Sequence, residues 1–106
     1  MTLSADLTLP GQVRATLERI LASPLFQQAE RQRRLLGYVV EESLAGRAHR
    51  LNQFALAVDV FDRDATFDPG VDAVVRVDVA RLRARLREYY EANPDERVVI
   101  RIPKGS

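Results

Sequence analysis

Cysteine is absent from this chain, and histidine occurs only once in its 106 residues. Without cysteine there are no disulfide bonds, thiolate metal ligands or cysteine nucleophiles, and this composition fits the reducing cytoplasm. The lone histidine, His49, has no partner for a metal site, so we expect it to be a surface loop residue. No pattern resembles a nucleophile with its base. The sequence therefore predicts neither an enzyme nor a bound cofactor, metal or small molecule.

Long hydrophobic runs are also lacking. The longest is only a few residues, which is too short for a membrane span, and the N-terminus lacks the basic and apolar regions of a signal peptide. Glycine and proline number five each, while 46% of the residues are hydrophobic and 29% are charged, which is the composition of an ordinary globular protein. We expect one domain, residues 11–106, preceded by a loose N-terminal arm, residues 1–10.

The net charge is only +1, but the charges are unevenly distributed. Residues 72–87 contain five arginines and two aspartates, which gives a local charge of +3. A second basic group, Arg31, Arg33 and Arg34, is expected to form a solvated turn near a helix start, with contact to phosphate as the alternative. The loop before residue 70 is acidic, and its spacing is not that of a calcium-binding loop, so we expect capping and ion pairing there. The acidic residues are Asp62, Asp64 and Asp68 in this loop and Asp59 just before it.

Apolar residues at helical spacing predict two helical stretches in the first half of the chain. The first covers residues 12–22. Ser23 and Pro24 then restart the helix, with serine as the N-cap and proline at the first helical position. We expect this second stretch to be broken near Gln28, and we expect Gly46 to end it in the left-handed conformation.

A third helix is predicted to begin after Asn52, which is a favourable N-cap residue. Its buried face is expected to be formed by Phe54, Ala57, Val58 and Phe61. Residues 62–70 form a loop in which Phe67 docks onto the core.

A strand is predicted near the C-terminus, where residues 97–102 alternate between apolar and polar side chains. An isolated strand leaves its hydrogen-bonding edges open, so this strand needs a partner. Residues 48–51 are the expected internal partner. Because the chain stops at Ser106, we interpret it as a fragment of a longer protein, cut within or just before a returning strand.

Residues 72–90 are the most informative stretch, and they are expected to form one helix ended by Asn93 and Pro94. At about 100° per residue, one narrow face should be buried. This face consists of Val75, Val79, Leu82, Leu86 and Tyr89. The opposite face is a strip of small or apolar residues, namely Ala73, Val77, Ala80 and Ala84. Arginines flank the strip on both sides: Arg76, Arg83 and Arg87 on one, Arg81 and Arg85 on the other.

Three blocks of the sequence occur in a characteristic order: RRLLGYVVEESLAG at 33–46, ALAVDVFDRDATFDPGVDAVVRVDVARLRARLREYY at 55–90 and VVIRIPKGS at 98–106. Together they resemble a winged helix-turn-helix domain of the response-regulator effector type. The resemblance is greatest to the N-terminal domains of multidomain bacterial regulators that continue into adenylate cyclase or repeat-containing regions. It covers roughly residues 22–106.

The resemblance implies a mainly α fold with a small β-sheet. It implies that residues 52–61 are the supporting helix and that residues 72–90 are the recognition helix, which lies in the major groove of DNA. The wing would begin at residues 103–105 and would be truncated. The DNA-binding residues expected on this basis and from the arginine pattern are Arg76, Val77, Ala80, Arg81, Arg83, Arg85, Arg87 and Lys104.

An alternative interpretation of the arginines is a solvated helix flank. Arginines and acids three or four residues apart form ion pairs worth about 0.2–0.5 kcal/mol each. Three such pairs are predicted, namely Asp78 with Arg81, Arg85 with Glu88, and Arg87 with Glu91. A solvated flank, however, gains nothing from a smooth apolar strip, whereas a DNA groove or a partner helix does.

The first functional hypothesis is a sequence-specific DNA-binding domain of a bacterial transcriptional regulator, with double-stranded DNA as its partner. One helix reads few base pairs, so we expect a dimer or a tandem array. The second hypothesis is a protein-interaction or self-association module on the same scaffold within a larger signalling protein. The N-terminal helices and the strip 73–84 are the candidate surfaces for a homodimer. A third is a domain that regulates an attached catalytic region.

Overall fold

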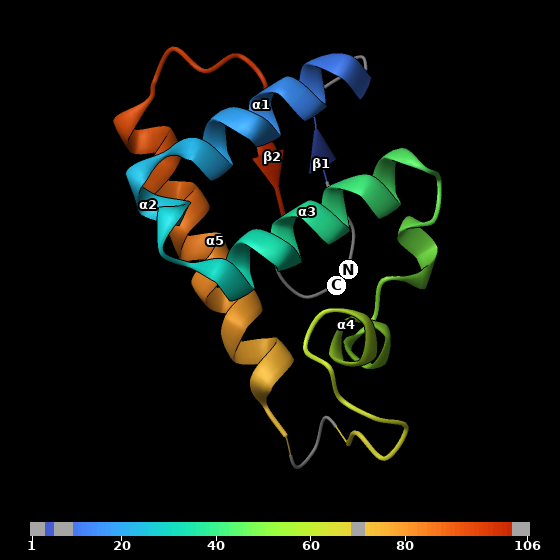
Figure 1. Ribbon diagram of the computed structural model, residues 1–106. Helices are drawn as coiled ribbons and strands as arrows, with labels where there is room; N and C mark the ends of the chain where they lie inside the picture. Colours follow the sequence, from blue (N-terminus) through green and yellow to red (C-terminus); the bar gives the residue numbers. More distant parts are fainter. Residues whose placement is uncertain (1–3, 6–9, 69–71, 103–106) are drawn as a thin grey trace.

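The computed structural model describes residues 4–5, 10–68 and 72–102. The described part of the chain is mainly helical (Figure 1). Its elements are β1 (Ser4–Ala5), α1 (Pro10–Ala22), α2 (Pro24–Gln27), α3 (Glu30–Leu44), the short 3₁₀ helix η1 (Ala48–Arg50), α4 (Gln53–Asp59), α5 (Val74–Ala92) and β2 (Ile100–Arg101). In this part no helix is both long and apolar enough to cross a bilayer.

Helix α5 is the element that the others surround. It contacts α2, α3, α4 and β2, while α1 packs on α2 and α3 (Figure 1). The face of α5 that the sequence predicted to be buried is buried, because none of its five side chains is more than 5% exposed. Phe26, Leu36 and Leu56 come from three other helices and complete the same core, each with no exposed surface. The helical spacing of residues 72–90 therefore predicted the core face correctly.

The ends of α3 also agree with the sequence. Gln28 lies in the break between α2 and α3, and Gly46 has a left-handed φ of 81°. The amide of Arg47 donates to the carbonyl of Glu42 at 2.8 Å, and the amide of Gly46 donates to that of Ser43 at 3.1 Å. This is a Schellman motif, which satisfies carbonyl groups that the helix end leaves without partners.

Ser23 occupies the N-cap position of α2, as predicted, but its hydroxyl does not cap that helix. The hydroxyl instead donates to the carbonyl of Ile20 at 2.6 Å, so it stabilises the end of α1. The capping prediction holds at Asn52, whose side-chain oxygen accepts from the amide of Ala55 at 2.8 Å.

The predicted buried face of α4 was partly wrong. Ala57 and Phe61 are buried, but Phe54 is 48% exposed and Val58 is 36% exposed. The buried face is completed by Leu56 and Val60 instead. Asp59 is the only polar residue from 54 to 61, so periodicity could not tell which face of this short helix would be covered. Phe67, in the loop that follows, is partly buried against the core, as predicted.

The predicted strand at residues 48–51 was wrong. This segment forms η1, in which the amide of Leu51 donates to the carbonyl of Ala48 at 3.0 Å. The partner of β2 is β1, which pairs with it in an antiparallel register that places Ala5 opposite Ile100. Residues 4–5 of the predicted loose arm therefore belong to the fold. Residues 1–3, 6–9 and 103–106, including Lys104 and the predicted wing turn, lie outside the described residues.

The alternation predicted for residues 97–102 is present, although only two of these residues are strand. Val98, Ile100 and Ile102 are buried, whereas Arg97 and Arg101 are exposed. The hydroxyl of Tyr90 donates to the carbonyl of Val98 and accepts from the amide of Ile100, both at 2.8 Å. Helix α5 thus holds residues 98–102 by hydrogen bonds of Tyr90 as well as by packing.

Candidate nucleic-acid interface

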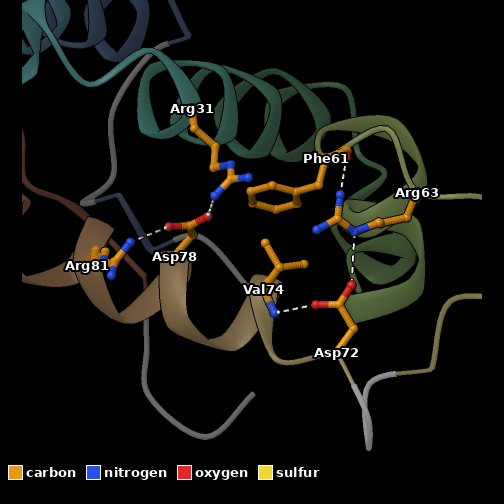
Figure 2. Close-up of polar contacts among 7 residues, drawn as sticks. All are labelled: Arg31, Phe61, Arg63, Asp72, Val74, Asp78 and Arg81. Carbon is orange, nitrogen blue, oxygen red and sulfur yellow. Dashed lines mark hydrogen bonds and ion pairs between the residues drawn. The ribbon is translucent and has the colours of Figure 1, made fainter.

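Helix α5 starts two residues later than predicted, at Val74, and the side chain of Asp72 accepts a hydrogen bond from its first amide. The carboxylate of Asp72 accepts from the amide of Val74 at 3.0 Å and from Nε of Arg63 at 2.9 Å (Figure 2). The Val74 amide, followed by the Arg63 guanidinium, holds the pKa of the Asp72 carboxyl below its usual value. The N-terminal end of the helix is therefore tied to the loop that follows α4.

Two of the predicted DNA-binding arginines form hydrogen bonds with backbone carbonyls of other segments. Nη1 of Arg85 donates to the carbonyl of Leu25 in α2 at 2.6 Å. Nε of Arg83 donates to the carbonyl of Ile102, after β2, at 2.9 Å. Both side chains are half-buried, and their hydrogen bonds connect α5 to distant segments. A guanidinium and a free carbonyl form a charge-assisted hydrogen bond, which is stronger than a neutral one.

The other predicted DNA-binding residues that the structure describes, Arg76, Val77, Ala80, Arg81 and Arg87, are exposed on α5. Val77 is 43% exposed and Ala80 is exposed, while Ala73 and Ala84 are half-buried. The arginines exposed beside them are Arg76, Arg81 and Arg87. We call Val77, Ala80 and these three arginines the outer face of α5. Of the three ion pairs predicted along the helix, that of Asp78 with Arg81 forms at 3.5 Å, whereas those of Arg85 with Glu88 and of Arg87 with Glu91 do not form in the described structure.

A buried acid lies at the inner edge of this face. The side chain of Asp78 is 3% exposed, and its carboxylate contacts Nη1 of Arg31 at 3.0 Å and Nη1 of Arg81 at 3.5 Å (Figure 2). The guanidinium of Arg31 also lies over the ring of Phe61, 5.4 Å from its centre. The carboxylate of Asp78 therefore joins α3 to α5. The guanidinium of Arg31 also joins these two helices to the segment that follows α4.

The role of Arg31 was missed at the sequence level, where it was placed in a solvated turn. A signal was present, because Asp78 lies three residues after Val75 and four before Leu82, within the face predicted to be buried. An acid at such a position needs a cation nearby. The sequence could not show which arginine supplies it, since Arg31 is 47 residues away along the chain.

The two other arginines of this basic group are also engaged. Arg33 donates to the carbonyl of Leu21 in α1, and Arg34 lies 3.6 Å from the carboxylate of Asp62. The acidic loop is used in the way that the sequence predicted, for pairing and capping. The hydroxyl of Tyr38 donates to Asp59 at 2.6 Å, and this hydrogen bond is the main cause that raises the pKa of Tyr38 to about 12. Asp64 accepts from the amide of Thr66 at 2.9 Å. His49 is exposed in η1.

Comparison of the chain with protein-family models, with curated proteins and with solved structures gives no match. Guanidinium groups bind phosphate and the hydrogen-bonding edge of guanine through paired N–H donors, and small apolar residues between them allow close approach. This arrangement is suited to a polyanion with a groove.

Proposed function

We propose that this chain is the DNA-binding domain of a bacterial transcriptional regulator, with a winged helix-turn-helix fold. In this proposal α4 is the supporting helix and α5 is the recognition helix that enters the major groove. The observation that carries the proposal is the outer face of α5, where Val77 is 43% exposed between arginines, on a helix whose opposite face is fully buried. A helix with one face fixed in the core presents the other without rearrangement.

The arrangement of the helices supports this proposal. In Figure 1 the first turns of α5 extend past α3, next to α4. Recognition helices contact base edges mainly through residues near their N-terminal end, and the preceding helix supports them. The exposed residues Arg76, Val77, Ala80 and Arg81 all lie in the first two to three turns of α5.

The division of the arginines refines the proposed contacts. Arg76, Arg81 and Arg87 are exposed, and we assign the contacts with DNA to them. Arg83 and Arg85 are bonded to carbonyl groups of other elements, so their main role in this proposal is to hold α5 in place. A single recognition helix reads few base pairs, and selectivity among genomic sites therefore requires a dimer or a tandem array.

A second candidate function is a protein-interaction or self-association module. It is favoured by the large apolar side chains left exposed, Phe54 and Val58 on α4 and Val77 on α5. Apolar side chains at a surface are typical of contacts with another protein as well as of contacts with thymine methyl groups. The two candidates therefore make different predictions for the same surface.

Ala80→Glu, with Ala92→Glu as its matched control, tests these proposals. Both alanines are exposed on α5, but only Ala80 lies on the outer face. A carboxylate at position 80 repels the phosphates of a bound duplex, so we expect Ala80→Glu to abolish a salt-sensitive gel shift and Ala92→Glu to preserve it. Both variants should melt within a few degrees of the parent protein, because neither alanine is buried.

Light scattering on the same proteins separates the two functions. A stable oligomer that Ala80→Glu dissociates, together with no binding to a random pool of duplexes at physiological salt, would favour the interaction module over DNA binding. If Ala80→Glu retains both the gel shift and the oligomeric state of the parent, the outer face of α5 carries neither function.

A further inference from the structure

A shallow hollow of about 300 Å³ lies where the start of α3 meets the middle of α5. Its lining includes three arginines, Arg31, Arg81 and Arg85, and two acids, Glu30 and Asp78. The lining therefore has a formal charge of +1, from three cations and two anions. Glu30 points largely into solvent, since its side chain is 81% exposed, and it lies 3.8 Å from Arg33. The arginines are the charges that dominate the hollow.

Asp78 determines how two of these arginines are held. Its side chain is only 3% exposed, so the carboxylate presents little surface to an anion in the hollow. Arg31 contacts Asp78 through Nη1. The other N–H groups of its guanidinium can donate to a ligand, because the side chain is 52% exposed. Arg81 is held by the same carboxylate and is 65% exposed. Donors fixed in advance by a buried acid lose little entropy when they bind a ligand.

Two further features border the hollow. Gln32, which also lines it, is 5% exposed, and its Oε1 has no hydrogen-bond partner. Ala29, at the N-cap of α3, has no side-chain group to accept from the first turn of that helix. Amide N–H groups of a first turn without a cap favour anions, and the helix dipole adds to this preference.

We propose that this hollow is a phosphate-binding subsite, in which Arg31 and Arg81 bind a backbone phosphate of DNA. The proposal rests on the DNA-binding function, and it adds Arg31 and the start of α3 to the contact surface. The hollow adjoins the outer face of α5, because Arg81 belongs to both. A duplex that receives Val77 and Ala80 in its groove would place the flanking backbone over Arg81, and hence over Arg31. Backbone contacts of this kind fix the orientation of the protein on the duplex.

Arg31→Gln, with Arg34→Gln as its matched control, tests the subsite. The two arginines are on α3, both are about half exposed and both form one ion pair, but only Arg31 lines the hollow. Binding to a fluorescent random-sequence duplex is measured by anisotropy over a series of salt concentrations. We expect Arg31→Gln to reduce the slope of log K against log salt by about 0.9, the value for one lost phosphate contact, and we expect Arg34→Gln to retain the parent slope. Equal slopes in the two variants and the parent would overturn the assignment to DNA.

A second arm uses inorganic phosphate and does not depend on DNA binding. The side-chain Nε–H signals of Arg31 and Arg81 are followed by NMR as phosphate is added. Shifts of both signals that saturate in the parent, together with loss of the Arg81 shift in Arg31→Gln, support the subsite, even if no duplex is bound, in which case DNA binding fails and the ligand is a free phosphate group. Linear or absent shifts in the parent protein overturn it. If Arg31→Gln does not fold, Arg31→Lys replaces it, because lysine keeps a cation beside Asp78 but lacks the forked donors.

Discussion

At the scale of single residues, a second carboxylate with little exposure links distant parts of the chain. The side chain of Glu96 is 8% exposed. It accepts from Nε of Arg19 in α1 at 3.1 Å and from the hydroxyl of Tyr89 in α5 at 2.9 Å. The Arg19 hydrogen bond is the main cause that lowers the pKa of Glu96, and the Tyr89 hydroxyl adds to it. The ionised form of Glu96 is therefore the form that stabilises the fold.

The pH dependence of Glu96→Gln tests this role. Because the pKa of Glu96 is lower in the folded chain than in the unfolded chain, its contribution is complete above about pH 4.3, the ordinary glutamate value. It declines as the pH falls below that value and is lost below the folded pKa. We expect Glu96→Gln to lower the free energy of unfolding by about 1 kcal/mol at pH 7 and by almost nothing in strong acid, measured by urea titration. Glu88→Gln, at an exposed position on α5, is the control and should show no pH-dependent difference.

At the scale of single elements, glycine has opposite effects on stability at two positions of α3 and its C-terminal end. Gly46 ends the helix with a φ of 81°, a conformation that costs other residues energy. Gly37 lies inside the same helix, where glycine costs backbone entropy. A Cβ atom added at either position meets no atom within 4 Å. Backbone conformation alone therefore distinguishes the two sites.

Alanine substitution at these two glycines should change stability in opposite directions. Gly46→Ala should lower the free energy of unfolding by about 1 kcal/mol, because alanine is strained in the left-handed region. Gly37→Ala should raise it by about 0.5–1 kcal/mol, because alanine is the better helix former. Thermal or urea unfolding of both variants measures the effects. A loss of stability in Gly37→Ala would show that its surroundings are tighter than the structure indicates.

At the scale of the whole molecule, polar contacts fix α5 to elements far away in the sequence. Arg85 reaches Leu25, which is 60 residues earlier, and Arg83 reaches Ile102 beyond the end of the helix. Arg31 reaches Asp78 from α3. The arginines of one helix therefore serve two purposes, because some hold the helix in the molecule and others remain at its surface.

Arg85→Met and Arg87→Met test this division. Methionine keeps an unbranched side chain in both variants but removes the donors. We expect Arg85→Met to lower the free energy of unfolding by about 1–2 kcal/mol, because the Leu25 carbonyl loses a charged donor. Arg87→Met should change it by less than about 0.5 kcal/mol, since Arg87 is exposed. Equal stability of the two variants in urea would mean that the contact with Leu25 does not anchor α5.

Much of the fold could be read from local patterns. The buried face of α5, the break near Gln28, the left-handed Gly46 and the cap at Asn52 were all predicted, because each depends on residues within one or two turns of each other. The strip opposite the core was predicted from the same helical geometry, and Val77 and Ala80 are exposed, whereas Ala73 and Ala84 are half-buried. Its use in DNA binding stays a prediction.

Contacts between distant segments were beyond the reach of these patterns. The alternation of residues 97–102 indicated a strand but not its partner, which proved to be β1 at the other end of the chain. The composition of α4 did not show that Phe54 would be exposed, and the spacing of the arginines did not distinguish Arg85 from Arg87. Hydrophobic periodicity determined which face of α5 turns inward, since it reflects the geometry of a single helix. Tertiary structure alone decided which arginines on its borders bond to other elements, because the carbonyls that accept from Arg83 and Arg85 lie in segments far away in the sequence.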